Sequence, residues 1–381
     1  MTVSVPPLRV ALVAKRALAA LPGLRAAGAV VCAVCETDPQ QLARMGEACG
    51  LPESRRLSDY ADVLCSEADA VVVGTPMHLH APQAIAALEA GRHVMSAVTA
   101  AVSLDQCRAL AAACERARAH GLVYMMDENA CFRRHTVLIR SLVRRGAFGD
   151  VYYAEGEYLH DVKHLHHGPD GAPTWRSTWQ VGRNGCTYGT HSLGPILQWL
   201  QGTSTGYPDP IASVSCLGSG RHTDPEHAME DTVVMLCKLA SGRLARVRVD
   251  MLSNRPQAVS NYTLQGTEGA YESQRASGER HRVWLSTRRE RSWQELDDFA
   301  DDLPEWYRTL ASQATEGGHG GGDFFTAWWF AQACLGIREV PITPEAALNW
   351  TAAGLVSQDS IRQGGMPLPV PGWAELARAP G

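Results

Sequence analysis

The sequence predicts an α/β protein in which a doubly wound parallel sheet is followed by an α+β domain with a large, mainly antiparallel open sheet. Up to about residue 127, short aliphatic runs alternate with alanine-rich stretches of helical length, which is typical of a parallel sheet with helices on both faces. Beyond that point, runs with a two-residue period indicate antiparallel strands with one face in solvent. We therefore expect two domains, residues 1–127 and residues 128–381.

The elements of the first domain follow from its apolar runs. Nearly continuous aliphatic stretches are expected of strands buried on both faces, and they predict strands at 10–13, 30–35, 70–74, 93–96 and 123–126. The stretches between them predict helices at 16–27, 39–49, 58–65, 82–90 and 104–120.

The second domain begins with a predicted helix at 136–146, which ends at a glycine. Alternating apolar and polar residues then predict strands at 151–158, 231–239, 243–251, 261–265 and 282–285. Residues 274–322 are charged and then glycine-rich, and we interpret them as an exposed excursion or flexible loop. Two final helices are predicted at 323–335 and 344–363.

Composition excludes several classes of protein. The 381 residues carry a net charge of −5, so there is no basic surface of the kind that binds nucleic acid. No apolar run reaches the ~20 residues that span a membrane, and the first residues lack a signal-peptide pattern, so we expect a cytoplasmic protein. The eleven cysteines are scattered, mostly in apolar runs, which favours buried, reduced thiols over disulfides.

Several motifs, in order along the chain, resemble one known family. Residues 71–82 (VVVGTPMHLHAP), 86–93, 146–151 and 265–272 are similar to motifs of the glucose–fructose oxidoreductase / inositol dehydrogenase / MocA (Gfo/Idh/MocA) family. Within it, 157–161 (EYLHD) and 188–195 (YGTHSLGP) resemble the NAD-dependent α-N-acetylgalactosaminidases. The resemblance implies a Rossmann-like first domain, and a second sheet that commonly supplies an oligomer interface, hence a homodimer or homotetramer.

The resemblance also implies a chemistry. In those glycosidases NAD removes a hydride from a sugar carbon, the neighbouring proton becomes acidic, the aglycone is eliminated, water adds and the hydride returns. Members carry tyrosine and histidine at the positions of Tyr188 and His191. The implied cofactor is therefore NAD, and the implied partner is a small sugar-like substrate.

The chain departs from the family at the phosphate-binding turn. Glycines there allow a tight turn and a close approach of the backbone to the pyrophosphate, but residues 13–22 (VAKRALAALP) contain none. Lys15 and Arg16 carry positive charge that suits phosphate, but the side chains of this turn occupy the space that the diphosphate needs. Glu36, after the second predicted strand, fits the family's ribose-binding acid, which would favour NAD over NADP, and fits an ordinary solvated loop acid equally well.

Two further departures concern proton transfer. Typical dehydrogenases of the family have Glu-Lys-Pro in the region of Ala97 and Val98, where neither side chain can titrate. They also have aspartates four residues before and three residues after the histidine that corresponds to His191, at the positions of Thr187 and Gly194. The family's proton chemistry is thus reduced to His191 with Tyr188 nearby.

A polar cluster remains that suits acid–base chemistry, because imidazole and a positioned phenol carry protons near neutral pH. On a strand Tyr158 and His160 share one face, and with Asp161 they stand at the strand's exit. We expect Tyr188 and His191 to transfer protons and Tyr158, His160 and Asp161 to orient the substrate. The alternative is a polar loop with one or two structural residues.

Other candidates follow the strands of the first domain, where open α/β sheets bind ligands, although local turn packing is an alternative. The expected cofactor-binding residues are Glu36, Thr75, Pro76, His78, His80, Glu128 and Asn129. The expected substrate-binding residues, with helix packing or a disordered loop as the alternative, are Trp175, Arg176 and His319. Closely spaced histidines in a loop indicate a metal only weakly, and we predict no metal site at His164, His166 and His167.

Three hypotheses for function follow. The first is an oxidoreductase-like enzyme of this family that acts on a sugar or sugar-like polyol with an eroded nicotinamide site. The second is an enzyme without a dinucleotide that uses the pocket of Tyr188 and His191 for elimination, hydration, isomerisation or hydrolysis. The third is a non-catalytic partner subunit.

Overall fold

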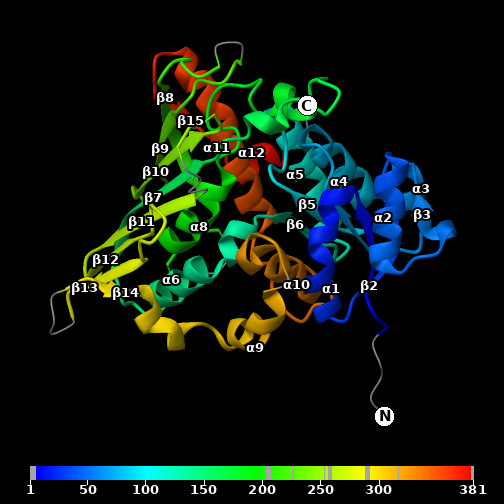
Figure 1. The fold of residues 1–381 in the computed structure, drawn as a ribbon. Helices are drawn as coiled ribbons and strands as arrows, with labels where there is room; N and C mark the ends of the chain where they lie inside the picture. The colour runs from blue at the N-terminus through cyan, green and yellow to red at the C-terminus, as the bar shows by residue number, and fades with distance from the viewer. Residues whose placement is uncertain are drawn as a thin grey trace.

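Two β-sheets form the framework of the protein in the computed structural model, which describes residues 6–202, 207–224, 227–252, 254–255, 260–287, 292–315 and 317–378 (Figure 1). The first sheet is wholly parallel, with the strand order β3-β2-β1-β4-β5-β6. Its order reverses between β1 and β4, which is where open sheets bind ligands. The strands are β1 (Arg9–Val13), β2 (Val30–Cys35), β3 (Arg56–Leu57), β4 (Ala70–Val73), β5 (His93–Ala97) and β6 (Tyr124–Asp127).

The helices of the first domain begin within two residues of the predicted starts. The side chains of Asp38, Asp59 and Ser103 accept backbone N–H groups at three helix starts. The predicted single helix at 16–27 is wrong: a 3-10 helix precedes an α-helix, because Pro22 lacks an N–H donor and favours the first turn of a new helix. The elements are η1 (Lys15–Ala20), α1 (Leu21–Ala26), α2 (Pro39–Cys49), α3 (Tyr60–Cys65), η3 (Met77–Leu79), α4 (His80–Glu89) and α5 (Leu104–Arg118).

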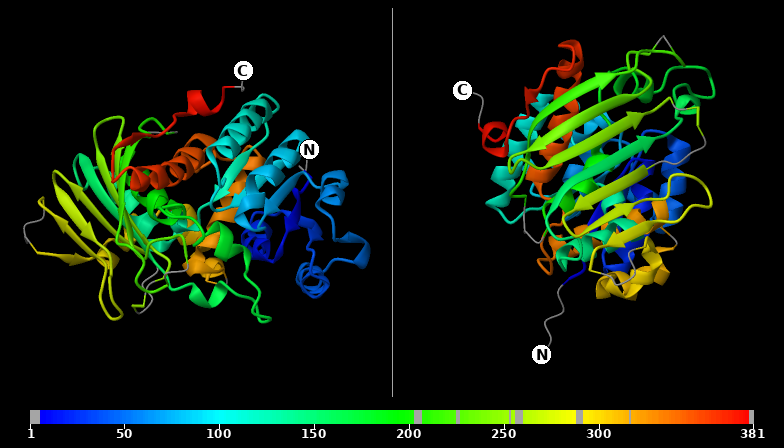
Figure 2. Two further views of the ribbon diagram at one scale, coloured as in Figure 1. Left: turned by 90° about the horizontal axis from the view of Figure 1, so that it is seen from above. Right: turned by 90° about the vertical axis from the view of Figure 1, so that its left-hand side faces the viewer.

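The second sheet has the order β14-β13-β12-β11-β7-β10-β9-β8-β15 and is antiparallel at every described pairing except β7 with β10. This confirms the predicted, mainly antiparallel sheet. The right-hand view of Figure 2 shows its open face, with helices behind it. The strands are β7 (Val151–Leu159), β8 (Ile211–Gly218), β9 (Val233–Leu239), β10 (Leu244–Asp250), β11 (Ser260–Gly266), β12 (Gly269–Glu272), β13 (Arg282–Leu285), β14 (Gln294–Glu295) and β15 (Leu368–Pro369).

Helices cover the inner face of this sheet and connect it to the first domain. Helix α8 lies against β7 and α11 against β8, whereas α10 packs against α1 and η1 of the first domain. A short 3-10 helix follows β6 directly. These elements are η4 (Asn129–Phe132), α6 (Arg134–Arg144), α7 (Trp175–Trp179), α8 (Thr190–Leu200), α10 (Gly322–Cys334), α11 (Pro344–Arg362) and α12 (Trp373–Leu376).

Part of the predicted loop at 274–322 is ordered structure. Strand β13 lies in it, as predicted. The segment also contains η6 (Leu296–Asp302) and α9 (Glu305–Ala314), whose buried residues include Phe299 and Tyr307. Apolar side chains spaced among acidic ones anchor this segment, so the interpretation as an exposed excursion is wrong for these elements. Residues 288–291 and 316 of the predicted loop lie outside the described residues.

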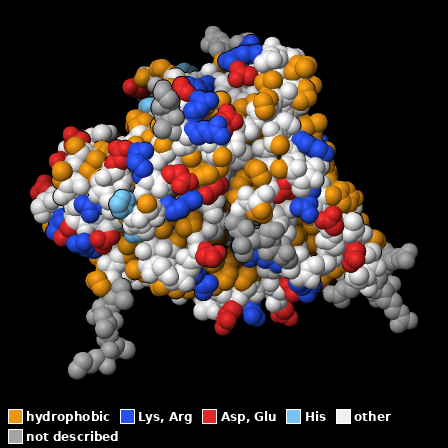
Figure 3. Space-filling view, turned by 180° about the vertical axis from the view of Figure 1, so that it is seen from behind, with side chains coloured by type: hydrophobic (Ala, Val, Ile, Leu, Met, Phe, Trp, Pro, Cys, Tyr) orange, Lys and Arg blue, Asp and Glu red, His pale blue; other side chains and the backbone are white. Residues whose placement is uncertain are grey.

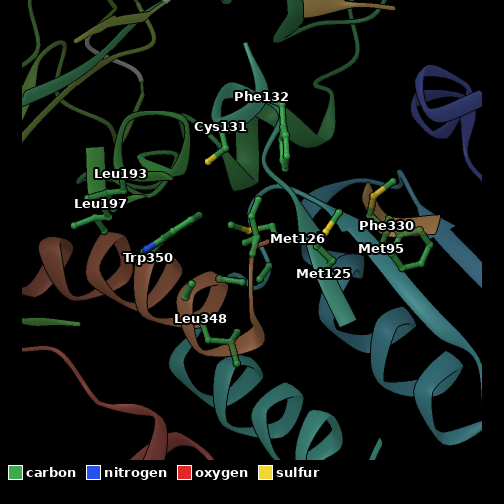
Figure 4. Close-up of a cluster of buried hydrophobic side chains, with 14 of the residues drawn as sticks. Met95, Met125, Met126, Cys131, Phe132, Leu193, Leu197, Phe330, Leu348 and Trp350 are labelled. Atoms are coloured by element: carbon green, nitrogen blue, oxygen red, sulfur yellow. The ribbon is translucent and has the colours of Figure 1, made fainter. Parts of the chain in front are cut away.

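One apolar cluster joins the two domains (Figure 4). Met95 and Met126 come from the first sheet, and Leu193, Phe330 and Trp350 come from α8, α10 and α11. All five are fully or almost fully buried. Because close-packed side chains transmit small displacements, this cluster fixes the carboxyl edge of the first sheet relative to α8 and α10.

The surface carries both signs of charge. The face seen in Figure 3 shows acidic and basic side chains interspersed, as the small net charge leads one to expect. Within the described ranges, no helix is both long enough and apolar enough to cross a membrane. All eleven cysteines are unpaired and most are buried.

The close approach of β7 to α8 predicts a stability effect. A Cβ atom added at Gly156 would lie 2.8 Å from both the Cβ atom and the carbonyl oxygen of Ser192. We expect Gly156→Ala to lower the free energy of unfolding in urea by about 1–3 kcal/mol, because α8 must move. The control is Gly372→Ala, where φ is −79° and no atom lies within 4 Å of the added Cβ. Equal stability of the two variants would contradict the prediction.

Candidate functional site

A buried histidine–carboxylate pair lies where the carboxyl end of β6 meets the first turn of α8. His191 Nδ1 is 2.6 Å from Oε1 of Glu128, and Glu128 is fully buried. The backbone N–H of Ala130 also donates to this oxygen, and the hydroxyl of Tyr262 donates to the carbonyl of His191 at 2.7 Å. A carboxylate that accepts the Nδ1 proton leaves the other ring nitrogen, Nε2, as a proton acceptor.

Two tyrosines surround this histidine, as the sequence predicts. The ring centroids of Tyr158 and Tyr188 lie 5.1 Å and 5.4 Å from that of His191, and 5.6 Å from each other. Burial raises the pKa of both phenols, so both stay protonated at neutral pH and act as hydrogen-bond donors. The Tyr158 hydroxyl lies 2.8 Å from His160 Nδ1. Burial, and then the charge of Arg176, lowers the pKa of His160, so its ring is neutral. In the tautomer that carries its proton on Nδ1, His160 donates to the Tyr158 oxygen and leaves the Tyr158 O–H free to donate to a ligand.

The predicted substrate-binding pair on α7 lies beside these phenols. The Arg176 guanidinium stacks 4.6 Å from the ring centroid of Trp175, and its Nη1 donates to Gln180 at 2.8 Å. Arg176 also forms a hydrogen bond with Tyr188. The structure thus brings a cation and an indole ring together at the tyrosine pair.

A second polar cluster lies at the same edge of the sheet and centres on Asp323, at the start of α10. Nη2 of Arg16 is 2.9 Å from Oδ1 of Asp323 and 3.9 Å from Oδ2 of Asp127. Asn129 Nδ2 donates to the same Asp323 carboxylate at 2.7 Å, and His319 Nδ1 lies 2.8 Å from its other oxygen. His319 is therefore tied to Asp323 by a hydrogen bond.

The pKa values of the two acids in this cluster are shifted in opposite directions. Burial raises the pKa of Asp127 to about 7; Asp323 and Glu128 add to the shift and Arg16 opposes it. The pKa of Asp323 is lowered: burial acts in the other direction, but the hydrogen bond from His319 and the charge of Arg16 outweigh it. Three buried oxygens beside this cluster have no described partner, namely Asp127 Oδ1, Glu128 Oε2 and Asn129 Oδ1. A polar ligand or water would satisfy them.

Glu36 follows β2 and caps the turn after β1. Its carboxylate accepts the backbone N–H groups of Lys15 at 3.0 Å and Thr37 at 2.8 Å, and a longer one from Asp38 at 3.3 Å. These local contacts give it the role of a loop cap, and its expected contact with a ribose stays a prediction.

The turn after β4 is held mainly by local contacts. His80 is buried, and its two ring nitrogens each lie 2.7 Å from a backbone carbonyl, at positions 75 and 99. The Thr75 hydroxyl lies 2.7 Å from the side-chain oxygen of Gln83, and Pro76 precedes η3. The ring of His78 stacks on Trp179, with centroids 5.0 Å apart. Backbone carbonyls thus engage both ring nitrogens of His80, and the cofactor contacts expected of all four residues stay predictions.

Side chains of the histidine-rich loop form polar contacts with other protein groups. Asp161 is exposed and pairs with Lys163 at 3.1 Å. His166 Nδ1 lies 2.9 Å from His227 Nε2. Among the described residues, no three His, Cys, Asp or Glu side chains converge so that they could hold a metal ion.

The cluster around Arg16, Asp127 and Asp323 is not predicted from the sequence. Arg16 and Asp323 are 307 positions apart, so no local pattern links them. The available signal was Asp323 itself, the only charged residue in the apolar helix α10. An acid buried in such a helix needs a partner.

The NAD implied by the resemblance can be tested against this geometry. The turn after β1 has no glycine, and Ala14 adopts a positive φ of 64°. The N–H of Ala14 donates to the carbonyl of Cys35, and that of Lys15 donates to Glu36. Arg16 points across the carboxyl edge of the sheet to its acidic partners. The side chains present therefore do not fit a diphosphate held on a glycine turn.

Comparisons with known protein families agree with the architecture. Residues 132–377 match the family model described as glycosyl hydrolase 109, C-terminal domain, and residues 13–126 match the oxidoreductase family, NAD-binding Rossmann fold. A glycosyl hydrolase family 109 protein from Shewanella pealeana is 29% identical over 364 residues, which cover 88% of this chain and 77% of the relative. One from Saccharopolyspora erythraea is 28% identical over 369 residues, covering 90% and 78%.

Solved structures share the fold. The WlbA dehydrogenase from Bordetella pertussis in complex with NADH and UDP-GlcNAcA has a TM-score of 0.71 at 22% identity, covering 96% of this chain and 98% of that one. Levoglucosan dehydrogenase in complex with NADH has a TM-score of 0.76 at 19% identity, covering 96% and 100%. The predicted fold class is confirmed.

The raised pKa of Asp127 predicts a pH dependence of stability. Between the ordinary value of 3.8 and about 7, the folded chain keeps a proton that the unfolded chain has released, so stability falls as pH rises. We expect Asp127→Asn to remove up to about 1.4 kcal/mol per pH unit of this slope, measured by urea unfolding across that range. Asp105→Asn is the control, because the side chain of Asp105 is 92% exposed. An unchanged slope in Asp127→Asn would count against the assignment.

Proposed function

The chain belongs to the glycosyl hydrolase 109 family, and from this premise we propose that it is an acid–base enzyme acting on a sugar or sugar-like polyol. The observation that carries the proposal is the buried pair of His191 and Glu128, enclosed by two protonated tyrosines. The first domain of the chain matches the oxidoreductase family with the NAD-binding Rossmann fold. That relationship supports an enzyme rather than a passive subunit.

Each residue has a chemical role in this proposal. His191 Nε2 removes a proton from the substrate, and the Glu128 carboxylate stabilises the imidazolium that forms. Tyr188 and Tyr158 donate their O–H groups to substrate oxygens on which negative charge develops. Neutral His160 orients the Tyr158 hydroxyl through their 2.8 Å contact.

The substrate class follows from the lining of the site and from the relatives. Arg176 and Trp175 offer hydrogen-bond donors and a flat apolar ring, which suit the hydroxyls and the apolar face of a sugar ring. The relatives and fold neighbours include a glycosyl hydrolase and a levoglucosan dehydrogenase, which supports a carbohydrate substrate. Asp161 lies at the exposed rim and is proposed only to orient the substrate.

The organisation of the molecule is proposed on similar grounds. The match to the Rossmann-fold model ends at residue 126, and the match to the C-terminal-domain model begins at residue 132. This supports a division into residues 1–127 and 128–381. A homodimer or homotetramer and a cytoplasmic location stay predictions.

A nicotinamide, where bound, would supply a hydride acceptor. Glu128 and Asn129, with their unpartnered oxygens, are the residues that would border it. Since the turn at Ala14 and Arg16 does not fit the diphosphate, the proposed proton transfers are derived without it.

The proposal predicts the effect of removing the base. We expect His191→Ala and Glu128→Gln to lower the rate of substrate turnover by about 10²–10⁴-fold, the usual contribution of a positioned acid–base group. The assay is release of p-nitrophenol from a panel of p-nitrophenyl hexosides and N-acetylhexosaminides, together with the derivatives oxidised to ketones on the ring. His120→Ala, in an exposed position at the end of α5, is the matched control. Full activity of His191→Ala, or no turnover of any glycoside by the unaltered chain, would refute the proposal.

A further inference from the structure

Arg16 closes the edge of the first sheet where a dinucleotide would have to lie. The strand order reverses between β1 and β4, and the carboxyl edge at such a reversal is the usual ligand crevice. Arg16 starts from the turn after β1 and reaches the acids that follow β6 and begin α10. The added Cβ of a substituted Gly74, at the end of β4, would lie 2.6 Å from the backbone nitrogen of Ala17. The turn is therefore packed directly against the neighbouring strand end.

Charge also opposes a dinucleotide at this edge. The Asp323 side chain is only 3% exposed, and Arg16 is the arginine that neutralises it. Moving Arg16 onto a diphosphate would leave that carboxylate, and the nearly buried Asp127, without their cation, which is costly in a protein interior. It would also bring two further negative charges beside three acids. The turn therefore offers no place for the diphosphate that would hold a hydride-accepting dinucleotide at this edge.

The proton-transfer groups, by contrast, are complete. A histidine base held by a buried carboxylate, with two protonated phenols beside it, is the set that removes a proton next to a carbonyl group and stabilises the enolate oxygen. A sugar that carries only hydroxyl groups has no C–H bond acidic enough for such a base. A sugar that already carries a ring ketone has one.

We infer that this enzyme takes a keto-sugar glycoside, so that a separate sugar oxidation must supply its substrate. The inference rests on the proposed function, since it assumes that His191 and the two tyrosines act on a sugar. It goes beyond that function by naming the oxidation state of the substrate and the class of reaction that comes before it.

The reaction balances without an oxidant. His191 Nε2 takes the proton from the carbon between the ketone and the anomeric carbon, and the electron pair moves to form an enolate that a tyrosine O–H stabilises. The pair then re-forms the ketone and a carbon–carbon double bond as the anomeric carbon–oxygen bond breaks, and the departing oxygen takes up a proton. Water adds its oxygen to the anomeric carbon and its hydrogen to the neighbouring carbon. The products are the free keto-sugar and the alcohol, with no net change in oxidation state.

The test compares matched substrates with the full chain. The probes are p-nitrophenyl 3-keto-glucosides and 3-keto-galactosides in both anomeric forms, and the same glycosides before oxidation, each with and without millimolar NAD. We expect p-nitrophenol from a keto-glycoside only, no dependence on NAD, and at least a hundredfold loss in His191→Ala. In D₂O the unaltered chain should also introduce deuterium beside the ketone.

The other outcomes separate the two claims. Cleavage of an unoxidised glycoside, dependent on added or co-purified NAD, would overturn the inference and leave the acid–base function standing. No cleavage and no deuterium uptake with any probe would overturn both. Cleavage of a keto-glycoside that persists in His191→Ala would refute the role of the base.

A binding experiment tests the closed edge independently of catalysis. We expect no saturable binding of NAD to the unaltered chain by calorimetry at up to millimolar NAD. In Ala14→Gly/Arg16→Gly, which reopens the turn, we expect saturable binding with a Kd at least tenfold below the highest NAD concentration tested. Arg44→Ala, at an exposed position of α2, is the control. Micromolar binding by the unaltered chain, or no gain in a double variant that keeps the native circular dichroism spectrum, would overturn the inference.

Discussion

The hydrogen bond between Glu128 and His191 is the constraint on which the site depends, because it ties a fully buried carboxylate directly after the first sheet to the first turn of α8. A buried charge without its partner is strongly destabilising, so the end of β6 and the first turn of α8 must stay together. Two glycines make this approach possible. A Cβ on Gly194 would lie 2.8 Å from the Cγ atom of Glu128, and one on Gly156 would collide with α8. The apolar cluster of Figure 4 adds contacts between the same two elements, with Met126 from β6 and Leu193 from α8.

The second constraint is the balance of charge around Asp323. Three acids, Asp127, Glu128 and Asp323, lie at one sheet edge, and Arg16 is the arginine that the structure places among them. This explains why the acids differ: Asp323 takes the closer contact with Arg16 and a hydrogen bond from His319, whereas burial dominates at Asp127. The phosphate turn and the catalytic edge are thus one electrostatic unit. A substitution of Arg16 would therefore remove the ion-pair partner of Asp323, 307 residues later in the chain.

Much of this architecture follows from patterns in the sequence, and the failures share a physical cause. Strand β2 and helix α2 have the predicted ends, because apolar period and an Asp cap are local properties. Helix α8 was missed because it is buried almost all round and contains Gly194 and Pro195, so it has neither an amphipathic stripe nor strong helix formers. Tyr188 and His191 were found through a short motif. Glu128, the partner of His191, was instead predicted to bind a cofactor. Its contact with His191 joins residues far apart in the sequence, so no local pattern reveals it.

The site keeps its proton-transfer groups and lacks the glycine turn for a dinucleotide, and these two features are chemically consistent. Burial raises the pKa of Tyr158 and Tyr188, which makes them poor bases and good donors to an oxygen that gains negative charge. Such donors are useful when charge appears on a carbonyl oxygen. Hydride transfer from a hydroxyl-bearing carbon would instead need an acceptor at the edge that Arg16 closes. An enzyme that meets its substrate as a ketone needs the donors and the base, and gains stability from an ion pair where the dinucleotide would otherwise lie.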